Sequence, residues 1–290
     1  MAVSPIPWPT FLVPGAGKSG TTYLLDVLKQ HKEIFVPYVK EPAFFSTYPG
    51  IGLYHKGVEF YRKQFWGYKG EPHIGEGSTV YMYDPESPKL IRKHIPNVKL
   101  IFLLRNPVDR VYSNYWQDIK AGVHLPEFSE FIFSGSERAY EMLYCSQYDV
   151  HLRRYLEYFP KEQILIVLSD FLKSNPHAAI NSVLAFLEAS PLPETFRLDF
   201  VSNPSALPRS RVLARMLRQQ AITQTIKGIV PSWAGPFLKR MLENLRHANQ
   251  VAFQYPPMDT TTRKRLVTFF LPTVEWLEKF LEMDLSHWKQ

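Results

Sequence analysis

A glycine-rich loop between an apolar segment and a helical pattern constrains this chain more than any other feature. The segment runs from Phe11 to Thr22 and reads FLVPGAGKSGTT. In such a loop the glycines let the backbone approach a ligand closely, and the N–H groups that open the following helix face one concavity. Lys18 adds a full positive charge. The segment therefore predicts a strand, a turn and a helix that together bind a phosphate-like anion.

The loop can be interpreted in two ways. A nucleoside-triphosphate loop requires a glycine five residues before its Gly-Lys-Ser/Thr end. Gly17 begins that end here, but the required position is Leu12. The run KSGTT instead resembles the 5′-phosphosulfate loop of sulfotransferases that use 3′-phosphoadenosine 5′-phosphosulfate (PAPS), in which a Lys-x-Gly-Thr-Thr core opens the first helix. This resemblance implies that the donor is bound by Lys18, Ser19, Gly20, Thr21 and Thr22.

A second segment favours the sulfotransferase interpretation. The apolar run 98–104 is typical of a strand buried in a parallel sheet, and it ends at Arg105. Pro107 suits the first turn of a helix, and Ser113 lies two turns into it. In sulfotransferases an arginine and a serine at such positions bind the donor's 3′-phosphate, and the resemblance implies these roles for Arg105 and Ser113. Taken singly, each has a structural alternative: a capping ion pair for the arginine and a solvated hydroxyl for the serine.

Further motifs occur in the order found in the heparan-sulfate type of sulfotransferase. The run KEPAFF at 40–45 precedes YHKG at 54–57, and GEGSTVY follows at 75–81. The segments Tyr255–Asp259 and Leu277–Trp288 resemble the C-terminal loop and last helix of that branch. The resemblance therefore covers most of the chain. Composition, with a single cysteine and no membrane-length apolar run, indicates a stand-alone, bacterial-style member.

Sulfuryl transfer needs charge stabilisation at the leaving oxygen and a base for the acceptor's proton. The resemblance implies the first role for Lys18 together with the loop amides. It implies the second for Glu41, because a glutamate just before a Phe-Phe pair is the proposed base of the heparan type. Apolar packing by Phe44 and Phe45 would raise the pKa of this carboxyl toward neutral pH. The alternative is a surface ion pair between Glu41 and Lys40.

Other candidate residues accompany these. Glu76, at the end of an expected strand, and His55, in the YHKG run, compete with Glu41 for the role of base. Tyr255 is expected to contact the donor. The basic cofactor loop of the heparan type appears here as VAFQYP at 251–256, without its basic residues, and nearby Arg246 is expected to compensate.

The pattern along the chain predicts an α/β fold with a mostly parallel sheet covered by helices. Apolar runs at 98–104 and 163–169 alternate with amphipathic stretches at 21–31, 86–94, 107–120, 149–158 and 176–188. With 290 residues and 45% hydrophobic content, the chain is expected to form one sulfotransferase domain over residues 1–290.

The number of cysteines and the net charge indicate where the protein is located and what it could bind. Cys145 is the only cysteine, and neither a signal pattern nor a membrane-length apolar run is visible, so a cytoplasmic location is expected. The net charge of +7 is concentrated in part between 208 and 248, where Glu243 is the single acid. That segment is either a surface helix with a solvated basic face or a cover over the donor's phosphates or an acidic substrate. Nucleic-acid binding is not expected, because no recognised motif accompanies the charge.

The only evidence on the acceptor is that this chain lacks two basic features of the heparan-type enzymes. Heparan-type enzymes carry a lysine at the position of Gly77, and that charge is missing, as is their basic cofactor loop. A small-molecule, lipid or glycan acceptor with a hydroxyl or amine is therefore expected, and a highly anionic polysaccharide is disfavoured.

Two hypotheses compete with sulfuryl transfer. A P-loop kinase or NTPase would need a metal-binding acid after a strand, which Asp170 could supply. A sulfotransferase requires no metal, and the kinase hypothesis leaves Arg105 and Ser113 without a role. The third hypothesis is a non-catalytic module that binds polyanions through the basic 208–248 segment.

Overall fold

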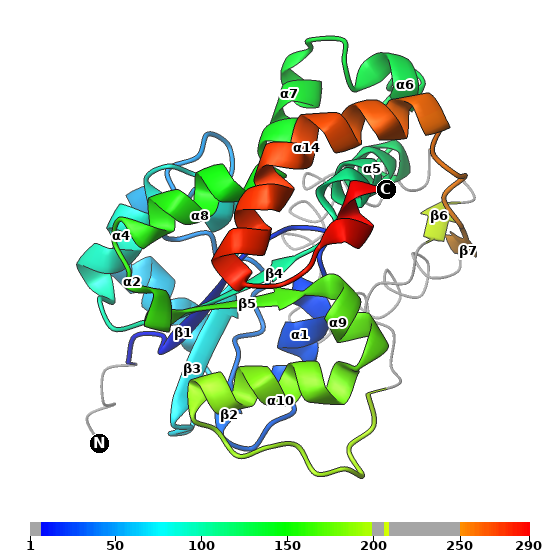
Figure 1. Ribbon diagram of the computed structural model, residues 1–290. Helices are drawn as coiled ribbons and strands as arrows, with labels where there is room; N and C mark the ends of the chain where they lie inside the picture. Colours follow the sequence, from blue (N-terminus) through cyan, green and yellow to red (C-terminus); the bar gives the residue numbers. More distant parts are fainter. Residues whose placement is uncertain (1–6, 199–205, 209–249) are drawn as a thin grey trace.

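A five-stranded parallel sheet forms the centre of the molecule (Figure 1). The computed structural model describes residues 7–198, 206–208 and 250–290. The strands lie in the order β2-β3-β1-β4-β5, and each neighbouring pair is parallel. Their bounds are β1 Phe11–Gly15, β2 Ile34–Phe35, β3 His73–Gly77, β4 Lys99–Leu104 and β5 Ile164–Leu168. This confirms the predicted fold class.

Helices cover both faces of the sheet because successive strand side chains point to opposite sides. In β4, Ile101 and Leu103 pack with one core cluster, whereas Leu100, Phe102 and Leu104 pack with another. The first cluster includes helices α1 Thr21–Leu28, α9 Ser169–Ser174 and α10 Pro176–Leu187. The second includes α2 Gly57–Arg62, α3 Val80–Tyr83, α4 Ser87–His94, α8 Tyr148–Leu156 and α14 Thr260–Leu281. Figure 1 shows the two groups on either side of the sheet.

A third cluster lies beyond the carboxyl ends of the strands. It is built by α5 Pro107–Lys120, α6 Phe128–Phe131, α7 Glu137–Tyr144 and the first half of α14, which cross at the top of Figure 1. The remaining elements are the antiparallel pair β6 Ala206–Pro208 and β7 Gln250–Ala252 and the short 3₁₀ turns η1 Tyr54–Lys56, η2 Lys63–Phe65, η3 Lys161–Gln163 and η5 Ser286–Lys289. No helix among the described residues is long and apolar enough to cross a membrane.

The last helix differs from the prediction. The segment Leu277–Trp288 was expected to be helical, but α14 begins at Thr260 and ends at Leu281. Glu282 then adopts a left-handed conformation with φ of 54°, which reverses the chain. The following residues form η5, whose Trp288 is buried.

Candidate functional site

The loop between β1 and α1 lies at the carboxyl edge of the sheet, where open α/β sheets bind ligands. Lys18 and Gly20 adopt left-handed conformations with φ of 72° and 100°. Two hydrogen bonds hold the loop: the Ala16 N–H donates to the Leu103 carbonyl of β4 at 2.8 Å, and the hydroxyl of Ser169, the first residue of α9, donates to the Ser19 carbonyl at 2.7 Å. The end of β4 and the start of α9 therefore help to fix the shape of the loop.

The loop presents several N–H groups that have no acceptor in the part of the chain that the structure describes. They belong to Gly17, Lys18, Gly20, Thr21 and Thr22. The Ser19 N–H differs, because it donates to the Ala16 carbonyl at 3.3 Å. Free donors at a helix N-terminus are the groups that bind a phosphate or sulfate.

Cations surround this loop. The pKa of Lys18 is lowered, first by burial of its ammonium group and then by Lys120, Arg105 and Arg110, while Tyr255 opposes the shift. An anion bound at the loop would relieve this repulsion, because it would place negative charge among four positive groups.

Arg110 is a member of this group that the sequence did not reveal. It is only 4% exposed, and its Nε donates to the Gly17 carbonyl at 3.0 Å. Its Nη1 donates to the Ser146 hydroxyl at 3.0 Å and to the Met142 carbonyl at 3.4 Å. All of these acceptors are neutral oxygens, so none of them cancels the positive charge of Arg110. The hydrogen bond to the Gly17 carbonyl holds this charged guanidinium against the loop.

Arg105 and Ser113 lie where the sequence predicts. Arg105 follows β4, and the Tyr148 hydroxyl donates to its carbonyl at 2.9 Å. Ser113 is on α5 and is buried. The capping ion pair offered as an alternative is not observed within the described ranges, because Asp109 in the first turn of α5 pairs with Arg263 at 2.8 Å. The Asn106 side chain caps α5 instead, accepting from the Val108 N–H at 2.9 Å.

Glu41 lies on an exposed loop on the adjoining part of this edge. The Thr79 hydroxyl donates to Glu41 Oε2 at 3.1 Å, and no salt bridge joins Glu41 to Lys40 among the described residues. Phe44 and Phe45 are fully buried, and Phe44 stacks on the Tyr61 ring with centroids 4.5 Å apart. The two rings therefore anchor the loop in the core, whereas the Glu41 side chain reaches solvent.

The two competing bases differ in their surroundings. Glu76 is 1% exposed and accepts hydrogen bonds from three hydroxyls, those of Tyr61, Ser78 and Tyr81. Burial raises its pKa to about 7, against the lowering effect of these hydrogen bonds, and Glu41 adds to the rise. His55 lies exposed in η1, and none of its contacts within the described chain joins it to Glu41. The structure thus brings Glu76, but not His55, close to Glu41.

Tyr255 and Arg246 complete the predicted set. The Tyr255 ring stacks on Trp116 of α5 at 5.9 Å, and Lys120 Nζ lies 3.4 Å from its hydroxyl. Lys120 is a second cation at this site that the sequence did not single out. Arg246 lies outside the described residues, as do residues 209–248 of the basic segment.

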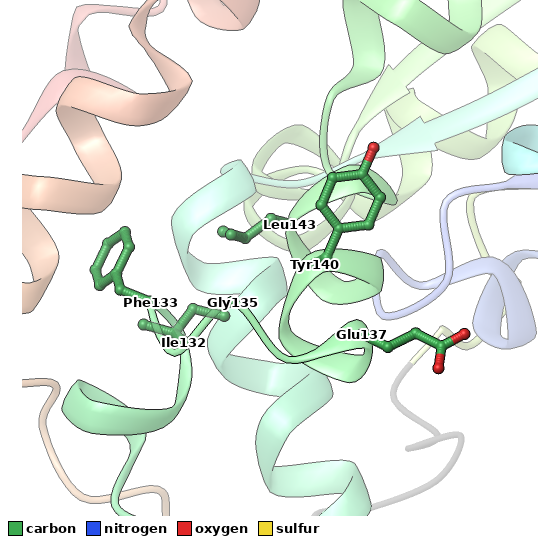
Figure 2. Close-up of a pocket in the computed structure, with 6 residues that line it drawn as sticks. All are labelled: Ile132, Phe133, Gly135, Glu137, Tyr140 and Leu143. Atoms are coloured by element: carbon green, nitrogen blue, oxygen red, sulfur yellow. The ribbon is translucent and has the colours of Figure 1, made fainter.

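Asp170, the acid that a kinase would use for magnesium, is already bound by the C-terminal turn. Its Oδ2 accepts from Trp288 Nε1 at 2.7 Å and lies 3.3 Å from His287 Nε2. A hollow of about 480 Å³ is formed by α7 and the segment that joins it to α6 (Figure 2). None of the predicted site residues belongs to its lining, which is Ile132, Phe133, Gly135, Glu137, Tyr140 and Leu143.

The family follows from comparison with known proteins. A family model described as a sulfotransferase domain matches residues 9–262. The chain belongs to the sulfotransferase family. This confirms the family predicted from the loop and from the segment around Arg105.

Curated sulfotransferases resemble this one over part of their length. Human heparan sulfate glucosamine 3-O-sulfotransferase 6 is 30% identical over 184 residues, which are 62% of this chain and 52% of that protein. Mouse bifunctional heparan sulfate N-deacetylase/N-sulfotransferase 4 is 32% identical over 202 residues, 63% of this chain and 22% of that protein. The chain thus spans about half the length, or less, of these two relatives.

A solved sulfotransferase shares the fold. The crystal structure of a sulfotransferase from Alicyclobacillus acidocaldarius superposes with a TM-score of 0.70 at 24% identity and covers 98% of this chain and all of that one. The parallel sheet and its flanking helices are therefore those of a sulfotransferase.

Proposed function

We propose that this sulfotransferase moves the sulfuryl group of PAPS to a hydroxyl or amine of a small-molecule, lipid or glycan acceptor. The observation that carries the proposal is the loop from Gly17 to Thr22, whose free N–H groups lie among four cations. Such a donor set suits an anion that carries more than one negative group. The names of the relatives, which are sulfotransferases of heparan sulfate, support the same reaction class.

The residues fit the two charged ends of this donor. Lys18 and the N–H groups of Gly20, Thr21 and Thr22 would hold the 5′-phosphosulfate. Arg105 would hold the 3′-phosphate, since its guanidinium has no carboxylate partner among the described residues. Ser113 on α5 would add a hydroxyl to the same end.

In the reaction PAPS supplies an activated sulfuryl group, and the bond to its phosphate oxygen breaks as the acceptor attacks. Lys18 and the α1 N-terminus stabilise the negative charge that develops on the leaving oxygen. Glu41 accepts the proton that the acceptor loses, because its carboxylate is exposed and within reach of an incoming molecule. Glu76 is too deeply buried to take this role.

Radiolabelled PAPS offered with a panel of acceptors tests the proposal. The panel contains phenols, lipid alcohols and desulfated heparan oligosaccharides, so that each acceptor class is represented. We expect label on at least one acceptor. Glu41→Gln should bind the product 3′-phosphoadenosine 5′-phosphate (PAP) normally and lose turnover, whereas Glu59→Gln, an exposed glutamate of α2, should leave turnover unchanged. Full activity in Glu41→Gln would overturn the assignment of the base.

A further inference from the structure

A buried carboxyl group lies beneath the loop that carries Glu41. Glu76 is the penultimate residue of β3 and is 1% exposed. Its Oε1 accepts from the Tyr81 hydroxyl at 2.8 Å and from the Tyr61 hydroxyl at 3.2 Å, and its Oε2 accepts from the Ser78 hydroxyl at 2.9 Å. No cation forms a salt bridge with it in the described ranges. A polar group buried at this depth is kept only where its hydrogen bonds are satisfied.

The third of these hydrogen bonds leads directly to the Glu41 loop. Ser78 donates its hydroxyl proton to Glu76, so its oxygen accepts from another donor, the Ala43 N–H at 2.9 Å. Both Ser78 and Ala43 are buried. The hydrogen bonds run in one direction, from the Ala43 N–H through the Ser78 hydroxyl to the Glu76 carboxylate.

The loop needs such support because its backbone is unusual. Glu41 and Ala43 both adopt left-handed conformations, with φ of 53° and 51°. Residues other than glycine keep this conformation only where the surroundings enforce it. Ala43 is held at both of its backbone groups, since its carbonyl also accepts from the Leu53 N–H at 2.9 Å.

A second contact links the same segment to Glu41 itself. Thr79, the residue after Ser78, donates its hydroxyl to Glu41 Oε2 at 3.1 Å. Residues 76–79 thus contact the Glu41 loop twice, once at its backbone and once at its carboxylate. The two residues that follow β3, Ser78 and Thr79, therefore determine where the carboxylate of Glu41 lies.

We propose that Glu76 and Ser78 are positioning residues for sulfuryl transfer: Glu76 orients the Ser78 hydroxyl, and Ser78 fixes the backbone that carries Glu41. The inference rests on the proposed function, in which Glu41 is the base. It assigns Glu76 a role through Glu41 rather than as a second base. Loss of the hydrogen bonds would displace the Glu41 carboxylate without disturbing the loop that binds the donor.

The first test measures the loop without any acceptor. Amide hydrogen exchange at Ala43 should be slow in the wild-type protein and at least about tenfold faster in Ser78→Ala. The matched control is Thr273→Val, which removes another buried hydroxyl, the one that donates to Asp149 Oδ1 at 2.6 Å between α14 and α8. The control should leave exchange at Ala43 unchanged. Should Ser78→Ala fail to fold, Ser78→Cys retains the side-chain volume with much weaker hydrogen bonds and should show the same effect.

The second test measures turnover with the best acceptor of the panel. Ser78→Ala should lower kcat by about ten- to a hundredfold, the cost of a misplaced catalytic group, with little change in KM for PAPS. If Ser78 acts through Glu41, the double variant Glu41→Gln/Ser78→Ala should be no slower than Glu41→Gln, within about twofold. A purely structural serine would instead lower kcat by the same factor in both backgrounds.

The outcomes separate the two proposals. Unchanged exchange at Ala43, or a full additional loss of kcat in the double variant, overturns the role of Ser78 and leaves the proposed function intact. Full turnover in Glu41→Gln overturns the base assignment, and this inference with it. Faster exchange together with non-additive kcat values is the result that we expect.

Discussion

Replacing the buried carboxyl of Glu76 by an amide should change how the stability of the protein depends on pH. Glu76→Gln retains the size and most of the hydrogen-bonding capacity of the side chain and removes its titration. Among the described residues, the groups that interact with Glu76 are Tyr61 from α2, Tyr81 from α3, Tyr155 from α8, the Ser78 hydroxyl and the Glu41 carboxylate, and none of them is a cation. Burial is therefore not offset by a positive partner, and the pKa rises to about 7.

The size of the effect follows from this pKa. The ordinary value is 4.5, and the folded value is about 7, so between these two the folded protein holds a proton that the unfolded chain has released. The folded state is accordingly stabilised below about pH 4.5, and that stabilisation is lost as the pH rises through 7. At roughly 1.4 kcal/mol for each unit of pKa, the full effect is on the order of 3 kcal/mol, most of it between pH 5 and 8.

Urea unfolding of the two proteins across this range measures the effect. We expect the free energy of unfolding of the wild type, relative to Glu76→Gln, to fall by about 3 kcal/mol from the acidic to the alkaline end. All other groups titrate alike in both proteins, so their contributions cancel when the two free energies of unfolding are subtracted. A difference that is constant with pH would contradict the raised pKa of Glu76, because it would mean that this carboxyl titrates alike in the folded and unfolded states.

Three further predictions concern the loop and its neighbours. Lys18→Ala should weaken PAP binding by about ten- to a hundredfold, the loss expected for a charge-assisted hydrogen bond, as measured by calorimetry; unchanged affinity would remove Lys18 from the donor site. Arg105→Ala should weaken PAP binding and leave the affinity for adenosine 5′-phosphate unchanged, since only PAP carries the 3′-phosphate; equal losses for the two nucleotides would contradict this assignment. Gly20→Ala should lower the free energy of unfolding by about 1–2 kcal/mol, because φ is 100° there and the new methyl group would lie 3.3 Å from Leu172 Cδ2; thermal unfolding checks it, and an unaltered midpoint would count against it.

Local patterns in the sequence were sufficient to predict strands β1, β4 and β5 and the glycine-rich turn between β1 and α1. The apolar run before Arg105 and the glycine-rich run before Thr21 each lie within one strand–turn–helix unit, so neighbouring residues specify their structure. The strand bounds of β4 and β5 agree with the predicted runs to within one residue at either end. Buried parallel strands leave this signal because both of their faces must be apolar.

The contacts that surround the expected base could not be predicted in this way. Ser78 and Ala43 are 35 residues apart, and neither belongs to a motif that specifies their hydrogen bond. The contact between Asp170 and Trp288 spans 118 residues. The role of Arg110 also depends on tertiary structure, although its position in the first turn of the helix that follows Arg105 was a usable signal. Contacts between distant segments depend on packing, which periodicity does not encode.

Calorimetric titration of the wild-type protein with PAP, ADP and ATP, each with and without Mg²⁺, tests the central claim most directly. We expect tight binding of PAP that needs the 3′-phosphate and is unaffected by magnesium, because Lys18 and Arg105 would bind the two ends of the nucleotide. Binding of ATP in preference to PAP, and only with magnesium, would contradict the proposed sulfuryl transfer from PAPS and would restore the kinase hypothesis.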